Sequence, residues 1–132
     1  MNTTNKILSE ISAGELMDKI TILEIKKVKI TDPEKQVIIN KELNSLHSTY
    51  QTSLTPSPEL QEQITKLKTI NLILWDIEEE KRECERQKNF GESFVQLARS
   101  VYIENDNRAK IKAEINRLTN STISEVKSYK AY

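Results

Sequence analysis

The sequence predicts an all-α fold, an antiparallel bundle of about four helices in which the two long helices form a hairpin. Three observations carry this prediction. Among 132 residues there are only 2 glycines and 3 prolines, and charged residues make up 30% of the chain against 36% hydrophobic. This composition is typical of amphipathic helices around a thin core. The few helix breakers are far apart, and apolar residues recur between them at spacings of three and four.

Length and charge restrict the class of protein further. A chain of 132 residues can bury one core but is short for two, so we expect residues 1–132 to form a single helical domain. The 20 basic residues balance the 20 acidic ones, and no net positive field favours nucleic acid or an anionic membrane. No apolar run approaches the roughly 20 residues of a membrane-spanning helix. We expect neither nucleic acid nor membrane as a partner.

Cysteine usage and the first residues indicate the compartment. Cys84 is the only cysteine, which excludes an internal disulfide. The first ten residues lack the basic-then-apolar order of a signal peptide. We therefore predict a cytoplasmic protein in which residues 1–12 lead into the first helix.

The first helix is predicted from Ala13 to Ile30. Leu16, Ile20 and Leu23 share one of its faces. Further apolar residues point elsewhere, namely Ile22, Ile25 and Val28. Because more than one side needs cover, we expect this helix to be central or to lie in a dimer interface.

The second and third helices begin at prolines that follow good N-cap residues. Asp32 precedes a helix from Pro33 to Leu54, and Ser57 precedes a helix from Pro58 to Lys88. The second helix carries a one-sided apolar stripe, which predicts a peripheral position. The stripe consists of Ile39, Leu43, Leu46 and Tyr50.

The fourth helix is predicted from Glu92 to Leu118, after a turn at Gly91. We expect Phe90 beside the turn to pack inward. The Asn-Asp-Asn stretch at 105–107 is a possible kink in this helix. Residues 119–132 are predicted to form a C-terminal tail that packs only partly.

The inward stripes of the two long helices change from apolar to charged. The third helix begins with Leu60, Ile64 and Leu67, but the same face continues as Asn71, Glu78, Arg82 and Glu85. On the fourth helix, Phe94, Ala98 and Val101 are followed by Asn105, Arg108 and Lys112. Burying unpaired charges costs several kcal/mol, so these groups must pair, be hydrated or bind something.

An antiparallel hairpin around Gly91 would bring the two charged stripes together. Residues whose numbers add up to about 179 then face each other, so Asn71 meets Arg108 and Glu78 comes within reach of Asn105. On the first helix, Glu24 and Lys27 fall among apolar residues and could form a third wall. The candidate ligand-binding residues are Glu24, Lys27, Glu78, Arg82, Asn105, Arg108 and Lys112. A satisfied structural network and a polar homo-oligomer interface are the alternatives.

An acidic cluster offers a metal-dependent alternative. Glu15 and Asp18 on the first helix resemble the Glu-x-x-Asp half of the acidic pattern of all-helical nucleotide pyrophosphohydrolases, but they precede the acidic run Glu78 to Glu80 instead of following it. This hypothesis would use Glu15, Asp18, Glu78 and Glu79. Acidic residues in a first helical turn also simply complement the helix dipole. We assign no metal-ligating residues, and the sequence does not identify a cofactor. The remaining reactive or aromatic residues suit structural roles: His47 at the surface, Cys84 at the core boundary and Trp75 in the core.

Five stretches of the chain carry a resemblance to a known family. They read GELMDKITILEIK at 14–26, LWDIEE at 74–79, LARSVY at 97–102, NDNRAKIK at 105–112 and EVKSY at 125–129. Together they resemble an uncharacterised family of small helical proteins from marine bacteria, cyanobacteria and their phages. Genes of this family sometimes lie beside glycosyltransferases of surface-polysaccharide synthesis. Val126 stands where the family pattern has a second glutamate.

The leading hypothesis is a binding or interaction module that recognises an anionic small molecule or a polysaccharide-pathway protein. In it, Arg108, Lys112 and Arg82 supply positive charge, and Glu24 and Glu78 orient them. We expect a homodimer. A metal-dependent phosphohydrolase and a purely structural homo-oligomer are the alternative hypotheses, so the sequence leaves open whether the protein is an enzyme.

Overall fold

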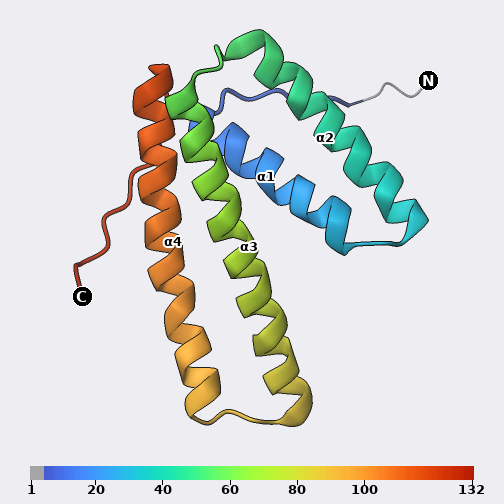
Figure 1. Ribbon diagram of the computed structural model, residues 1–132, viewed down its shortest axis with the longest axis vertical. Coiled ribbons are helices and arrows are strands. Elements are labelled where there is room, and N and C mark those ends of the chain that lie inside the picture. Colours follow the sequence, from blue (N-terminus) through green and yellow to red (C-terminus); the bar gives the residue numbers. More distant parts are fainter. Residues whose placement is uncertain (1–4) are drawn as a thin grey trace.

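The computed structural model describes residues 5–132 and confirms an all-α bundle of helices (Figure 1). The helices are α1 (Ala13–Lys29), α2 (Pro33–Ser53), α3 (Pro58–Gln87) and α4 (Glu92–Thr119). No strand occurs in the part of the chain that is described. Each predicted boundary lies within one residue of the observed one, because the breakers act locally.

Side-chain caps fix the starts of the first three helices. Asp32 Oδ2 accepts from the backbone N–H of Lys35 at 3.2 Å, and Ser57 Oγ accepts from that of Leu60 at 3.1 Å, as the sequence predicts. The turn between α3 and α4 differs from its prediction. Lys88, at the C-cap of α3, takes the left-handed conformation with φ 54°, while Gly91 is the N-cap of α4 with φ −81°.

The two long helices form the predicted hairpin, and α1 crosses its upper half obliquely (Figure 1). Helix α1 packs against α2, α3 and α4, whereas α2 packs on α1. The central position of the first helix and the peripheral position of the second are thus confirmed. At 1.5 Å per residue α3 is roughly 45 Å long and α1 roughly 26 Å. The lower half of the hairpin extends beyond α1, and there α3 and α4 pack on each other.

The main core lies where α1 meets the other helices. Leu67 and Ile115 are both 0% exposed, and aliphatic residues of α1 and α2 surround them. Burial of such side chains supplies most of the stability of an amphipathic bundle. Phe90 lies far from this core and is 51% exposed, packing edge-to-face on Phe94, so its predicted inward packing is wrong.

The middle of α4 and the two ends of the chain were the other regions for which there were expectations from the sequence. Helix α4 continues without a break through residues 105–107. The tail after Thr119 has no regular secondary structure and runs back along α4. Residues 5–12 of the predicted lead-in carry no helix, and residues 1–4 lie outside the described part. No described helix has the length and hydropathy needed to cross a bilayer.

The N-terminus of α1 is held by the C-terminal end of α4. The backbone N–H of Gly14 donates to Asn116 Oδ1 at 2.7 Å, and that of Ala13 donates to Ser121 Oγ at 3.1 Å. Ser12 Oγ accepts from the N–H of Glu15 at 3.0 Å. Three side chains therefore satisfy three N–H groups that a helix start otherwise leaves unpaired.

Candidate functional site

A buried carboxylate lies at the crossing of α1, α3 and α4. Asp18 of α1 is 2% exposed. Its Oδ1 accepts from Arg108 Nε and from Asn71 Nδ2, each at 2.9 Å, and Arg108 Nη2 donates to Oδ2. Arg108 on α4 and Asn71 on α3 are opposite each other in the predicted register, and both converge on this one carboxylate. The bidentate pairing with a guanidinium is the strongest common form of charge-assisted hydrogen bond.

Thr21, one turn after Asp18, completes the buried end of the network. Its hydroxyl accepts from Asn71 Nδ2 at 3.0 Å and lies 2.9 Å from the carbonyl oxygen of Met17, to which it donates. In the described residues, no buried side-chain nitrogen or oxygen lacks a hydrogen-bond partner. The inner half of the cluster is therefore a satisfied structural network, as a buried charge requires.

Lys112 of α4 forms the outer half of the network. Its Nζ donates to Glu15 Oε2 at 2.8 Å and to Glu125 Oε2 at 3.1 Å, and lies 3.7 Å from Asp18 Oδ2. Glu125 belongs to the C-terminal tail, and its other oxygen lies 3.8 Å from Lys127 Nζ. The side chain of Lys112 is 10% exposed, whereas that of Glu125 is 50% exposed. Two lysines thus hold one carboxylate near the surface.

The electrostatics of the cluster favour the charged forms of Asp18, Lys112 and Glu125. Burial raises the pKa of Asp18, but hydrogen bonds from Arg108 and Asn71 and the nearby positive charges outweigh it, and the pKa lies below its ordinary value. Burial lowers the pKa of Lys112, but hydrogen bonds to Glu15 and Glu125 reverse the effect and raise it. The hydrogen bond from Lys112 lowers the pKa of Glu125.

A pocket of about 250 Å³ opens over the outer half of the cluster. Arg108, Lys112 and Lys127 line it together with Glu15 and Glu125. Asn105 also lines it, and its Oδ1 accepts from Arg108 Nη1 at 3.3 Å. The charged network therefore reaches solvent here, with three cations within one hollow.

The structure brings together only part of the predicted set of ligand-binding residues. Asn105, Arg108 and Lys112 lie in the cluster. Glu24 instead lies 3.6 Å from Lys68 on another side of α1, and Lys27 is exposed.

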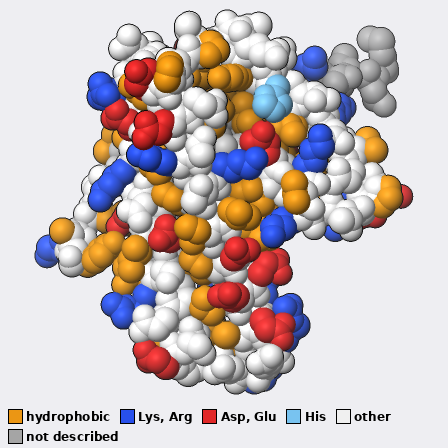
Figure 2. All heavy atoms as spheres, viewed as in Figure 1, with side chains coloured by type: hydrophobic (Ala, Val, Ile, Leu, Met, Phe, Trp, Pro, Cys, Tyr) orange, Lys and Arg blue, Asp and Glu red, His pale blue; other side chains and the backbone are white. Residues whose placement is uncertain are grey.

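Glu78 and Arg82 lie on the lower half of the hairpin, away from the cluster. Glu78 pairs with Lys81 at 3.2 Å and does not hydrogen-bond to Asn105, and Arg82 is exposed. Figure 2 shows acidic side chains gathered over this part of the molecule. The stripe of α3 continues in the predicted direction, but α1 ends before it can cover these residues, so their charges stay in solvent.

The most buried charged residue of the cluster, Asp18, is absent from the predicted ligand-binding set. Its position near the start of α1 suggested that it only complements the helix dipole. However, Thr21 follows Asp18 by three residues and Ile25 follows Thr21 by four, and all three side chains are buried. That second buried face of a central helix is the signal that places Asp18 inside. Glu125 had no such signal, because an irregular tail has no periodicity that gives its position.

The acidic residues of the metal-dependent alternative are not gathered into one site, because Glu15 and Asp18 lie beside Lys112 whereas Glu78 pairs with Lys81. Both oxygens of Asp18 accept from Arg108, and Glu78 lies beyond the end of α1. Within residues 5–132, no group of three or more His, Cys, Asp or Glu side chains is arranged to hold a metal ion. His47 and Cys84 are each partly buried and do not belong to the cluster.

Comparison with known proteins places the chain in a family without assigning an activity. A family model described as a family of unknown function (DUF6165) matches residues 7–132. Neither the curated proteins nor the solved structures contain a match.

Proposed function

The chain belongs to this family of unknown function, DUF6165, and we propose that it is a binding module that holds an anionic small molecule on Lys112 and Lys127. One observation carries the proposal. The carboxylate of Glu125 lies between the two lysines, 3.1 Å from Lys112 Nζ and 3.8 Å from Lys127 Nζ. An external phosphate or carboxylate of similar size would take the same position. We call Lys112, Lys127 and Arg108 the anion site.

The Glu125 side chain is suited to leave this position. It is half exposed and comes from a segment without regular secondary structure, so it can turn into solvent while the helices stay in place. Its departure leaves three cations against the two carboxylates of Glu15 and Asp18. The site then favours an anion, and hydrogen bonds from two lysines to a phosphate are charge-assisted. Glu15 and Asp18 hold Lys112 and Arg108 in place.

The proposal is tested by titrating inorganic pyrophosphate in a calorimeter at low, fixed ionic strength. Glu125→Gln should bind it roughly fivefold more tightly than wild type, because the competing charge is worth about 1 kcal/mol. Lys112→Gln should bind it at least about tenfold more weakly, since a hydrogen bond to a charged group contributes about 1.5 kcal/mol or more.

Glu114→Gln is the matched control. Glu114 lies on the same helix and pairs with Arg117 at the surface, outside the pocket. Its substitution should leave pyrophosphate binding unchanged. No heat of binding at millimolar pyrophosphate, or weaker binding by Glu125→Gln, contradicts the proposal.

Two sequence-based expectations accompany this proposal. The single cysteine agrees with a reducing compartment such as the cytoplasm. A polysaccharide-pathway partner, implied by the family resemblance, stays a prediction.

A further inference from the structure

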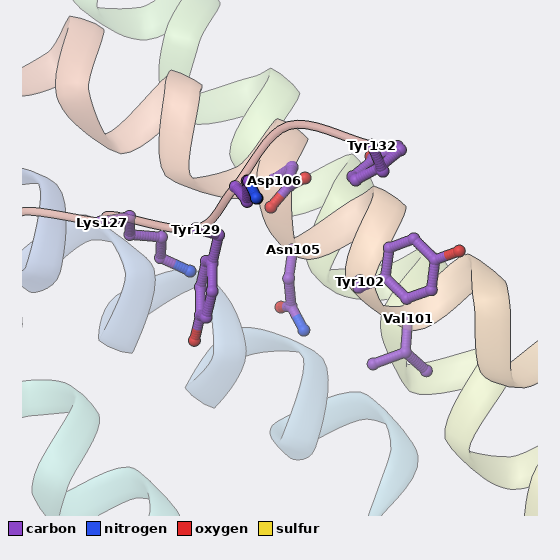
Figure 3. A pocket seen from close by; sticks show the side chains of 8 residues that line it. Val101, Tyr102, Asn105, Asp106, Lys127, Tyr129 and Tyr132 are labelled. Carbon is purple, nitrogen blue, oxygen red and sulfur yellow. The ribbon is translucent and has the colours of Figure 1, made fainter.

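A second hollow lies beside the anion site, between α4 and the C-terminal tail. It measures about 330 Å³, at the small end of the range for ligand pockets. Figure 3 shows Tyr129 on one side and Tyr102 on the other, with Asn105 between them. Tyr132 packs edge-to-face on Tyr102, with ring centroids 5.2 Å apart. We call this hollow the tyrosine pocket; its lining residues are Val101, Tyr102, Asn105, Asp106, Lys127, Tyr129, Lys130 and Tyr132.

The tyrosine pocket and the anion site form one continuous surface. Asn105 and Lys127 line both hollows. The Lys127 ammonium, which faces Glu125 in the anion site, also lies 5.7 Å from the centroid of the Tyr129 ring. A single small molecule can therefore contact the lysines with one end and the tyrosine rings with the other.

The two hollows differ in chemistry. The anion site presents Lys112, Lys127 and Arg108. The tyrosine pocket presents three tyrosine rings and Val101, and its charged lining residues are Lys127, Lys130 and Asp106. Its aromatic rings distinguish it from the anion site, and the oxygens of Asp106 can accept hydrogen bonds from an amino group. Tyr129 is 82% exposed, so a ring face remains available for stacking.

From this juxtaposition, we infer that the ligand is a nucleotide, whose phosphate occupies the anion site and whose base stacks in the tyrosine pocket. This inference rests on the proposed anion site and adds the class of ligand. Aromatic side chains stack on any base through its π face, and neighbouring cations strengthen the contact.

The test compares two phosphomonoesters that differ at the anomeric carbon, which carries adenine in AMP and a hydroxyl in ribose 5-phosphate. In calorimetric titrations, AMP should bind wild-type protein roughly fivefold or more tightly than ribose 5-phosphate, the gain typical of stacking on one aromatic ring. Tyr129→Leu should reduce AMP binding to the level of ribose 5-phosphate and leave ribose 5-phosphate binding unchanged. Tyr129 is an exposed tail residue, so this variant keeps the helical core intact.

Phe90→Leu is the matched control, since Phe90 is an exposed aromatic residue at the far end of the hairpin. It should leave both affinities unchanged. If AMP and ribose 5-phosphate bind equally well, and pyrophosphate binds in its own titration, the nucleotide inference is overturned and the anion site is still supported. A third outcome is that AMP binds but pyrophosphate does not, and that Tyr129→Leu removes AMP binding whereas Lys112→Gln does not. This outcome supports the tyrosine pocket and contradicts the anion site. Absence of all binding contradicts both.

Discussion

Asp18 is a charged group in a nearly dry position, and its partners explain why it stays charged. Burial disfavours the ionised form, but two hydrogen bonds from Arg108 and one from Asn71 favour it more strongly. Because its pKa in the folded state lies below the unfolded value, Asp18 stabilises the fold above the unfolded pKa. This contribution is lost as pH falls through the folded pKa.

Asp18→Asn should therefore be strongly destabilising at neutral pH. Removing one partner of a buried ion pair costs about 3 kcal/mol, because the other charge is left without compensation. We expect that loss in urea unfolding at pH 7, and we expect the difference from wild type to shrink as pH is lowered below the ordinary value of 3.8.

Glu24→Gln is the comparison for this prediction, since Glu24 forms a partly exposed pair with Lys68. Glu24→Gln should lower the free energy of unfolding by less than about 1 kcal/mol. A difference between wild type and Asp18→Asn that does not change between pH 7 and pH 3 would show that the charge of Asp18 is not what stabilises the fold.

Individual site residues were predictable only where a periodic helix gives their direction. Asn105, Arg108 and Lys112 follow from the stripe of α4, and Asn71 follows from the hairpin register. Glu125 lies in a tail without periodicity, and the tail's path depends on its contacts with α4, which the sequence does not reveal.

At the scale of helices, α1 and α4 cross with almost no space between them. A Cβ atom added at Gly14 would lie 2.6 Å from the carbonyl oxygen of Lys112 and 3.0 Å from Asn116 Oδ1. The neighbouring atom is backbone and cannot move aside cheaply. Because Gly14 has no side chain, the backbones of α1 and α4 can approach closely at this point. This close approach keeps Lys112 near Glu15 and Asp18.

Gly14→Ala should be destabilising although alanine has the higher helix propensity. Overpacking costs about 1–3 kcal/mol, and the gain in propensity offsets up to about 1 kcal/mol of it. Thermal or urea unfolding measures the net loss. Gly91→Ala is the control, because the nearest atom to its added Cβ is 3.5 Å away, and its cost should stay below about 1 kcal/mol. A Gly14→Ala protein as stable as wild type would contradict the tight crossing.

Helix boundaries were predictable because their signals are local. Asp32–Pro33 and Ser57–Pro58 combine a side-chain acceptor with a residue that has no N–H to satisfy. The turn after α3 was less predictable, since Lys88 rather than glycine takes the left-handed conformation. How far α1 extends along the hairpin depends on where it crosses α4 at Gly14, which the sequence does not show. Glu78 and Arg82 therefore could not be excluded from the candidate ligand-binding residues on sequence grounds.

At the scale of the whole molecule, the hairpin leaves apolar side chains partly uncovered. Four of its large aliphatic residues are at least a third exposed: Leu72, Ile73, Val95 and Ile103. We propose that they contribute to the homodimer expected from the sequence, since a second copy would supply the cover that a two-helix segment lacks.

Light scattering coupled to size-exclusion chromatography tests the dimer. Wild-type protein should have about twice the chain mass of 15.3 kDa, and Ile73→Glu should shift it to one chain mass. Val28→Glu is the control, because Val28 is exposed on α1 away from the hairpin, and it should leave the mass unchanged. A strict monomer at millimolar concentration would contradict the dimer.

The cap at the start of α1 has a consequence for how the chain folds. The acceptors for the N–H groups of Gly14 and Ala13 come 102 and 108 residues later in the chain, and Arg108 follows Asp18 by 90. During synthesis the α1–α2 pair precedes α3 and α4, so it lacks both these acceptors and the helices that bury Asp18. We therefore expect the α1–α2 pair to become stable only once α4 has left the ribosome, so that folding follows synthesis instead of accompanying it.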